Sequence, residues 1–115
     1  MRVRNSTLPG GIDLIEVEGV ILGGGEIDAL RKAIEKSVDS KSTKLIVDLS
    51  GTTHLNSAAL GVLVAAAITY SRRSWKLRLC GLSNAVHSIF AITKLNLMFD
   101  LVDTRDNAVR SFRES

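Results

Sequence analysis

Ser57 is the residue whose type and position best suit a regulatory chemistry. It follows an apolar run at residues 45–47 and a short polar segment, and a long apolar segment with helical spacing begins there. The first N–H groups of a helix have no partners within the helix, and the aligned peptide dipoles leave partial positive charge at that end. A phosphate on a hydroxyl at this point would therefore be stabilised. Ser57 is therefore the candidate regulatory residue; the simpler alternative is an N-cap serine that contributes about 1 kcal/mol to helix stability.

Two histidines and a cysteine could suggest other chemistry. His54 lies close before Ser57, as a Ser/His nucleophilic pair would require, but no Gly-x-Ser-x-Gly segment surrounds the serine. A serine hydrolase is therefore a much weaker hypothesis, and we expect a protein that is not an enzyme. We expect His54 to lie in a loop and His87 on a helix surface. Cys80 falls inside a predicted strand, where a small core side chain is expected rather than a reactive thiol.

Other polar and glycine-rich features point to no cofactor. Asp48 ends the apolar run at residues 45–47; we expect it near Ser57, where it either contributes to the site or only caps a turn. The glycines at 23–25 lack the spacing of a nucleotide-binding loop, and no Cys/His spacing indicates a metal site. A basic cluster after the long apolar segment is either a solvated helix end or a surface that attracts an acidic partner. Its members are Arg72, Arg73, Lys76 and Arg78.

Composition narrows the class of protein. The 115 residues fit one domain, 1–115, and a hydrophobic fraction of 45% with 23% charged residues argues against disorder. A net charge of +3 and 4% aromatic residues predict no binding to nucleic acid. The single cysteine fits a reducing compartment, so we expect a cytoplasmic protein. The longest nearly continuous apolar run, residues 58–68, is shorter than the roughly 20 residues of a membrane span, so no membrane insertion is expected.

The first half of the chain predicts a hairpin, a helix and a central strand. Strands at residues 3–8 and 12–17 flank a turn at 9–11, with Ile12, Leu14 and Val17 turned inward and an extension at 20–22. Residues 26–38 have the apolar spacing of an amphipathic helix that covers one side of a sheet. Residues 45–47 predict a strand buried on both faces, and the polar residues 48–50 are expected to end it.

The second half alternates helices and strands. A helix over 57–72 has one apolar stripe, and its other face is small or apolar too, so an exposed apolar surface beside Ser57 is expected to bind protein. The stripe comprises Leu60, Leu63, Val64, Ala67 and Ile68. A strand at 75–80 precedes a helix that Ser83 caps and that ends near Asn96. A short strand at 99–102 follows, and Asp103 or Thr104 caps a last helix that carries Ala108, Val109 and Phe112.

The order of these elements predicts an α/β fold. Alternation of strands and helices indicates a mostly parallel or mixed sheet with right-handed crossovers, here with four to six strands and about four helices. Functional sites in such folds lie at the carboxyl ends of strands. Ser57 follows the carboxyl end of the predicted central strand, so the fold and the electrostatics of the helix terminus select the same position.

Four segments resemble the STAS domain, in particular the single-domain anti-sigma factor antagonists of bacteria. They are IVDLSG at 46–51, NSAALGVL at 56–63, LRLCGLS at 77–83 and ITKLNLMFDLVDT at 92–104. The similarity extends from about residue 14 to 112 in the order and spacing of the family. The resemblance implies a STAS-type α/β fold in a single domain.

The resemblance also implies a function. In antagonists of this family a partner that is both anti-sigma factor and serine kinase phosphorylates the serine at the position of Ser57. The dephosphorylated protein binds that partner and frees the sigma factor for transcription, and a cognate phosphatase resets the switch. The expected oligomeric state is a monomer or weak dimer. The partner-binding residues by this resemblance are Asn56, Ser57, Ala58, Leu60, Gly61, Asp48, Glu26 and Asp28.

Three positions depart from the family pattern. Asn56 stands where the family has aspartate, and it keeps a capping oxygen but lacks the charge. Ala58 and Ala59 replace a hydroxyl residue and a glycine. The first helix is expected to be shortened or shifted, so the acidic residue that faces Ser57 would be Glu26 or Asp28. The departures at Asn56 and Ala58 motivate an alternative: an unphosphorylated subunit of a lipid-transport ABC complex or of a stress-signalling assembly.

Overall fold

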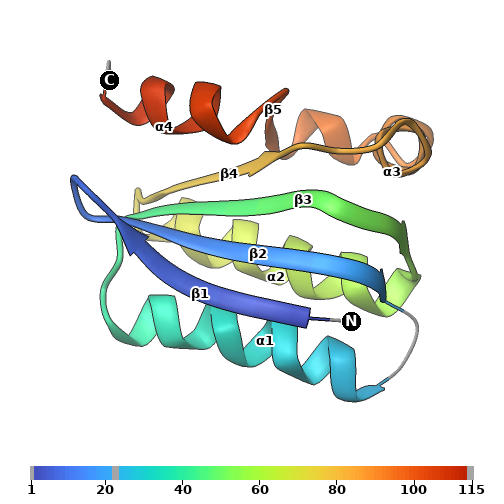
Figure 1. The fold of residues 1–115 in the computed structure, drawn as a ribbon, viewed down its shortest axis with the longest axis horizontal. Helices are drawn as coiled ribbons and strands as arrows, with labels where there is room; N and C mark the ends of the chain where they lie inside the picture. Colours follow the sequence, from blue (N-terminus) through green and yellow to red (C-terminus); the bar gives the residue numbers. More distant parts are fainter. Residues whose placement is uncertain (1, 22–23, 114–115) are drawn as a thin grey trace.

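The computed structural model describes residues 2–21 and 24–113, and these form a mixed five-stranded sheet with helices on both faces (Figure 1). The strands are β1 (Arg2–Leu8), β2 (Ile12–Ile21), β3 (Lys44–Leu55), β4 (Lys76–Cys80) and β5 (Asp100–Val102). The helices are α1 (Gly24–Asp39), α2 (Ser57–Arg72), α3 (Asn84–Ile92) and α4 (Arg105–Arg113), with a 3-10 turn η1 (Leu95–Leu97). The predicted α/β class, strand number and helix number are confirmed. Leu22 and part of the predicted 23–25 turn lie outside the described residues.

The sheet has the order β1-β2-β3-β4-β5, which makes β3 the central strand as predicted. β1 runs antiparallel to β2, and the other neighbours are parallel. The hairpin turn uses Gly10 and Gly11 at φ angles of 92° and 75°, a region that side chains other than glycine rarely adopt. The predicted hairpin is therefore confirmed.

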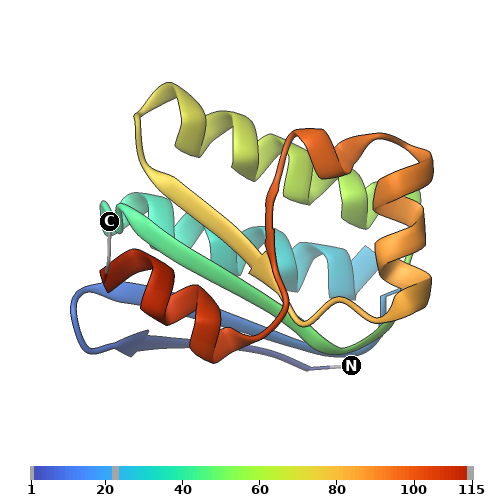
Figure 2. The same ribbon diagram turned by 90° about the horizontal axis from the view of Figure 1, so that it is seen from above.

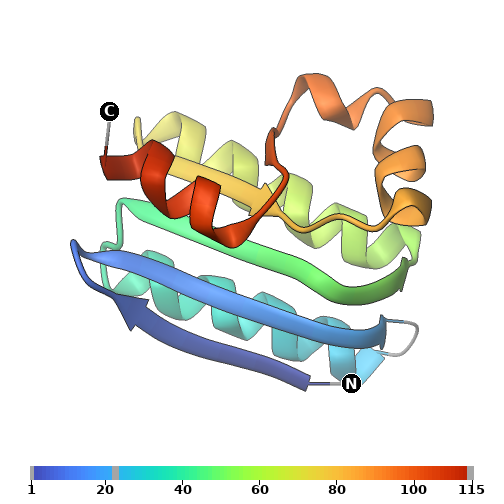
Figure 3. The same ribbon diagram turned by 45° about the horizontal axis from the view of Figure 1, so that its top comes forward.

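The helices cover the two faces of the sheet unequally. α1 and α2 lie on one face and α4 on the other, while α3 lies beyond the end of β4 and packs on the second half of β3 (Figures 1 and 3). Both faces of β2 are consequently buried at its start. Ile12 and Leu14 join the core under α4, and Val17 joins the larger core with α1 and α2. All three are buried as predicted, but they divide between two cores.

The prediction that residues 48–50 end the central strand is wrong, because β3 continues to Leu55. β2 keeps pairing with β3 as far as Ile21 opposite Leu55, whereas β4 stops at Cys80 opposite Asp48. Beyond Asp48 most side chains of β3 are exposed, which explains their polar character. His54 lies on this strand and not in a loop, so that prediction is also wrong.

The extension of β3 is irregular. The register with β2 shifts between Glu16 and Glu18, where β3 carries an extra residue. The buried hydroxyl of Thr52 donates a hydrogen bond of 2.9 Å to the carbonyl of Val17 at this irregularity. A side chain thus replaces part of the backbone ladder and lets the strand run on to Leu55, two residues before α2 begins.

The buried face of α2 differs from the predicted stripe. Its buried residues are Ala59, Val62, Leu63, Ala66 and Tyr70. Of the predicted stripe only Leu63 is buried; Leu60, Val64 and Ala67 are half-buried, and Ile68 is exposed. Burial of the large Tyr70 ring, which meets Trp75 edge-on at 5.4 Å, sets the rotation of the helix. A helix that is apolar all round gives no sequence signal for this choice.

The predicted caps are confirmed, and one boundary is corrected. The hydroxyl of Ser83 accepts from the N–H of Val86, and the hydroxyl of Thr104 accepts from the N–H of Asn107. The prediction that the third helix ends near Asn96 is wrong, because α3 ends at Ile92. Lys94 takes a left-handed conformation with φ 61°, which stops the helix and starts the turn η1.

Candidate functional site

The candidate site is the start of α2, and Asn56 shapes it. The side-chain oxygen of Asn56 accepts a hydrogen bond of 2.9 Å from the N–H of Ala59, so Asn56 is the N-cap. Ser57 is the first residue of the helix, and its side chain is exposed. The alternative interpretation of Ser57 as the N-cap is therefore wrong. Among the described residues no hydrogen bond involves the Ser57 hydroxyl, which leaves it free for modification.

The electrostatics of this helix start favour an anion. α2 has 16 residues and no acidic residue in its first turn. The backbone N–H groups of Ser57 and Ala58 have no acceptor within the helix, because the capping oxygen is taken by Ala59. A phosphoryl group on Ser57 would meet these donors and the positive end of the helix dipole, an interaction of about 0.3–1 kcal/mol at an exposed site.

The next residues of α2 offer an approachable surface. Ala58 and Gly61 are exposed, and Leu60 is half-buried. A Cβ atom at Gly61 would meet nothing within 4 Å, so the fold does not require glycine there. The structure therefore brings four of the predicted partner-binding residues together beside Asn56.

Glu26 and Asp28 lie in the first two turns of α1, at the same end of the molecule as the start of α2 (Figures 1 and 2). Asp28 is exposed and pairs with Arg31 on its own helix. Glu26 is half-buried. α1 starts earlier and runs longer than the predicted range 26–38. Which of the two carboxylates faces Ser57 stays a prediction.

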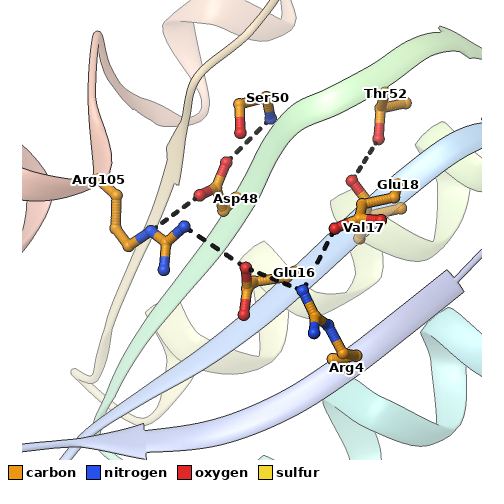
Figure 4. Close-up of polar contacts among 8 residues, drawn as sticks. All are labelled: Arg4, Glu16, Val17, Glu18, Asp48, Ser50, Thr52 and Arg105. Carbon is orange, nitrogen blue, oxygen red and sulfur yellow. Dashed lines mark hydrogen bonds and ion pairs between the residues drawn. The ribbon is translucent and has the colours of Figure 1, made fainter.

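Asp48 is not brought to Ser57, because its side chain points into the layer of α4 on the opposite face of the sheet (Figure 4). It is only 4% exposed. One carboxylate oxygen accepts from the N–H of Ser50 at 2.9 Å, and the other accepts from Nε of Arg105 at 3.0 Å. Asp48 therefore joins β3 to the first residue of α4.

The charged network continues across the sheet. Arg105 also approaches Glu16 at 3.4 Å, and Arg4 lies 3.8 Å from Glu16 and 3.3 Å from Glu18 (Figure 4). An open hollow of about 650 Å³ lies over this face. It is lined by Arg2, Glu16, Val17, Glu18, Gly19, Asp48, Ser50, Gly51 and Arg105. Sequence reasoning missed Glu16 and Arg105; the signal was an aspartate in a buried strand, which requires a cation from elsewhere in the chain.

The other sequence candidates are two histidines and a cysteine. His54 is exposed, and its ring contacts the Thr53 hydroxyl at 3.1 Å instead of Ser57. His87 lies on the surface of α3 as predicted. Cys80 is fully buried, and burial, with Asp48 nearby, raises the pKa of its thiol to about 12. The prediction of a core thiol is therefore confirmed.

The basic cluster does not form one surface. Arg73 stacks over Trp75 at 4.9 Å, near the end of α2, whereas Arg78 stacks over Phe112 of α4 at 4.1 Å. These guanidinium groups lie on opposite faces of the sheet, so the prediction of a single cluster is wrong. The separation arises because Arg73 is the C-cap of α2, which covers one face of the sheet, whereas the Arg78 side chain of β4 points to the face that α4 covers.

Within residues 2–21 and 24–113 no group of acidic, histidine and cysteine side chains is arranged to hold a metal ion. No helix in the described part of the chain is long and apolar enough to cross a membrane.

Comparison with known proteins matches this chain to one protein family. The STAS domain model matches residues 9–108. A comparison with curated protein sequences finds no match.

Solved structures share the fold. An anti-sigma factor antagonist from Mycobacterium paratuberculosis has a TM-score of 0.84 and 24% identity over 97% of this chain and 93% of that chain. A Thermotoga maritima protein assigned to the anti-sigma factor antagonists has a TM-score of 0.84 and 17% identity over 96% of this chain and 94% of that chain. The Bacillus cell fate determinant SpoIIAA in its phosphorylated form has a TM-score of 0.77 and 13% identity over 96% and 99%.

Proposed function

Because this chain belongs to the STAS domain family, we propose that it is an anti-sigma factor antagonist that phosphorylation of Ser57 switches off. In this proposal the unmodified protein binds an anti-sigma factor with serine kinase activity and thereby frees a sigma factor. A phosphatase restores the binding form. The protein itself catalyses no reaction, and it works in the bacterial cytoplasm.

The observation that carries the proposal is that capping of α2 and the proposed modification belong to different residues, Asn56 and Ser57. Asn56 caps α2, so the Ser57 hydroxyl has no part in holding the helix. A kinase can therefore modify an exposed hydroxyl without breaking a structural hydrogen bond. The resemblance to antagonists of known structure, one of them solved in a phosphorylated form, supports regulation by phosphorylation.

Phosphorylation would act on the docking surface and leave the fold in place. A phosphoserine adds a charge of about −1.5 to −2 at neutral pH and three acceptor oxygens. At Ser57 that group would stand over exposed Ala58 and Gly61, where the unmodified chain presents little bulk and no charge. A partner surface shaped to fit these small residues would lose both fit and charge balance.

A second candidate function follows from Asn56 and Ala58. Asn56 replaces the family aspartate, and Ala58 replaces the second hydroxyl residue. A chain that is never phosphorylated would have no need for either group. The alternative is a constitutive subunit of a lipid-transport ABC complex or a stress-signalling assembly, in which binding does not respond to charge at residue 57.

The test combines phosphorylation with binding. The purified protein is incubated with ATP and an anti-sigma factor kinase from the same genome, and the modified residue is located by mass spectrometry. We expect one phosphate at Ser57 and none in a Ser57→Ala variant. Ser57→Asp is expected to weaken kinase binding by at least about tenfold, a cost of about 1.4 kcal/mol.

A matched control separates local from general charge effects. Ser40 is also exposed and lies after the far end of α1, so Ser40→Asp should leave kinase binding unchanged. Equal binding by the unmodified protein and Ser57→Asp would contradict the switch. Co-purification with an ATP-binding transport subunit, unaffected by Ser57→Asp, would favour the constitutive subunit.

A further inference from the structure

The charges of this chain are distributed unevenly along the sequence. Residues 49–99 contain none of the 12 acidic residues, although they make up α2, β4, α3 and η1. Basic residues do occur in that segment, among them Arg72 at the end of α2 and Lys94 after α3. The surface that these elements form is therefore free of carboxylates except where neighbouring segments border it.

The large exposed apolar side chains of the described residues all lie in the same segment. Their exposed fractions are 39% for Ile68, 81% for Ile92, 82% for Leu97 and 46% for Met98. We call these four residues the α2–α3 apolar surface. Single exposed apolar residues are common on proteins, but several displayed by one turn and the helix beside it are typical of an interaction site.

Three of the four residues, Ile92, Leu97 and Met98, lie in or beside the turn that follows α3. Backbone hydrogen bonds from Lys94 to Ala91, from Leu97 to Lys94 and from Met98 to Leu95 close the turn. Beneath it Phe90 and Phe99 meet edge-on at 5.4 Å and are buried. The apolar groups are thus displayed by an anchored turn.

The turn lies along α2, as Figure 2 shows. A hollow of about 190 Å³ lies between them, and Ala67, Ser71 and Met98 are among its lining residues. Asp100, the nearest following carboxylate, lines the same hollow together with Lys76. Met98 lines this hollow, and Ile68 follows Ala67 on α2, so a helix laid over the turn would meet both apolar side chains.

Cations flank the apolar groups. Arg72 follows Ile68 by one helical turn on α2, and Lys94 stands between Ile92 and Leu97 in the turn. Both cationic side chains are exposed. An apolar surface bordered by positive charge and lacking carboxylates in its own segment is complementary to an apolar segment bordered by negative charge.

We infer that the α2–α3 apolar surface binds an acidic amphipathic helix of a protein partner. A second copy of this chain fits less well, because the outer faces of α1 and α4 mix both signs of charge. An anionic membrane fits less well too, since two flanking cations supply about 1 kcal/mol each, less than a polybasic membrane-binding segment supplies.

The part of this surface around Ile68 is remote from the proposed phosphorylation site. Ile68 is 11 residues beyond Ser57 on α2, or about 16 Å along the helix axis. The inference does not require that Ser57 is phosphorylated or that the partner is a kinase.

The test uses a designed peptide of about four helical turns with leucines on one face and glutamates on the other. Binding is measured by fluorescence anisotropy, and the bound surface is mapped by amide chemical shifts in NMR. We expect shifts at residues 64–72 and 90–98. Ile92→Ser and Lys94→Glu should each weaken binding by about tenfold, and added salt should weaken it further.

Controls make the result specific. Lys41 is exposed and has a left-handed φ of 56°, like Lys94, so Lys41→Glu should leave peptide affinity unchanged. Ser57→Asp should also leave it unchanged, which separates this inference from the proposed switch. Circular dichroism confirms that each variant is folded.

Four results would overturn the inference. Two concern the peptide: equal binding of a peptide with lysines in place of glutamates, and amide shifts confined to other elements. The other two are a concentration-dependent dimer that Ile92→Ser dissociates, and binding to vesicles of phosphatidylcholine and phosphatidylserine that Ile92→Ser abolishes. The last two would assign the surface to self-association or to a membrane.

Discussion

Replacing Arg105 by methionine removes the cation that faces a buried carboxylate. Asp48 has a side chain only 5% exposed, and Arg105 donates to it from Nε at 3.0 Å. The Asp48 carboxylate keeps its second hydrogen bond, from the Ser50 N–H, in the variant. Methionine preserves much of the arginine stem, so the loss is mainly that of one charge-assisted hydrogen bond.

The expected cost follows from the exposure of the pair. A hydrogen bond to a charged group contributes about 1.5–3 kcal/mol. Arg105 is 42% exposed, so water can reach the site in the variant and the lower part of that range applies. We expect Arg105→Met to lower the free energy of unfolding by about 1.5–2 kcal/mol. At this chain length that corresponds to a fall in Tm of about 6–8 °C.

A double-mutant cycle in urea unfolding tests the assignment. Asp48→Asn keeps an acceptor for the Ser50 N–H and removes the charge, so adding Arg105→Met to it should cost less than about 0.5 kcal/mol. Arg110, exposed on the same helix, is the matched control, and Arg110→Met should change stability by less than about 0.5 kcal/mol. Equal costs of Arg105→Met with and without Asp48 would refute the reasoning.

Four further predictions follow from the site and the core. Asn56→Ala should destabilise the protein by about 1 kcal/mol in thermal unfolding, whereas Asn56→Asp should keep the cap. If a carboxylate at residue 56 helps to position the Ser57 hydroxyl for the kinase, Asn56→Asp should also speed phosphorylation in a kinase assay. Asp48→Asn should leave kinase binding unchanged in titration calorimetry, because Asp48 faces α4. Gly81→Ala should cost at least about 1–2 kcal/mol in urea unfolding, since Gly81 has φ 71° and a Cβ there would lie 2.7 Å from Cβ of Ser50. The Cys80 thiol, with its pKa raised from 9.0 to about 12, should resist alkylation in the native protein. The contribution of this thiol to stability is complete below pH 9.0 and is lost as the pH rises toward 12, and unfolding measured at alkaline pH tests this.

Local signals in the sequence predicted local features of the structure. Pro9, Gly10 and Gly11 specify a turn by backbone geometry alone, and the hairpin formed around them. Ser83 and Thr104 cap helices through hydrogen bonds to residues three positions later. Such contacts depend on neighbours that are present in the sequence window, so they can be read without knowing the fold.

Features that depend on distant partners were not predicted. Asp48 accepts a hydrogen bond from Arg105, which is 57 residues away in the sequence. No local sequence pattern links two residues so far apart. The end of β3 depends on how far β2 remains beside it and on where β4 stops. The polar residues 48–50 therefore suggested the end of the strand, whereas β3 continues and pairs there only with β2.

The rotation of α2 shows why the candidate site itself was only partly predictable. Ser57 was placed correctly because the start of a helix is a local property. Which residues beside it are exposed depends on Tyr70, whose burial turns Leu63 inward and Ile68 outward. In a helix with apolar residues on every side, tertiary packing alone decides the face that a partner can reach.

The positions of Ser57 and Asp48 separate switching from stability. The stabilising charge pair lies between the sheet and α4, while the modifiable hydroxyl lies at the start of a helix on the other face. The cap of that helix belongs to Asn56, so a charge at residue 57 disturbs neither the cap nor the buried pair. In the proposed switch, a phosphate at Ser57 would therefore change the surface presented to a partner at little cost in folding free energy, as a reversible protein switch requires.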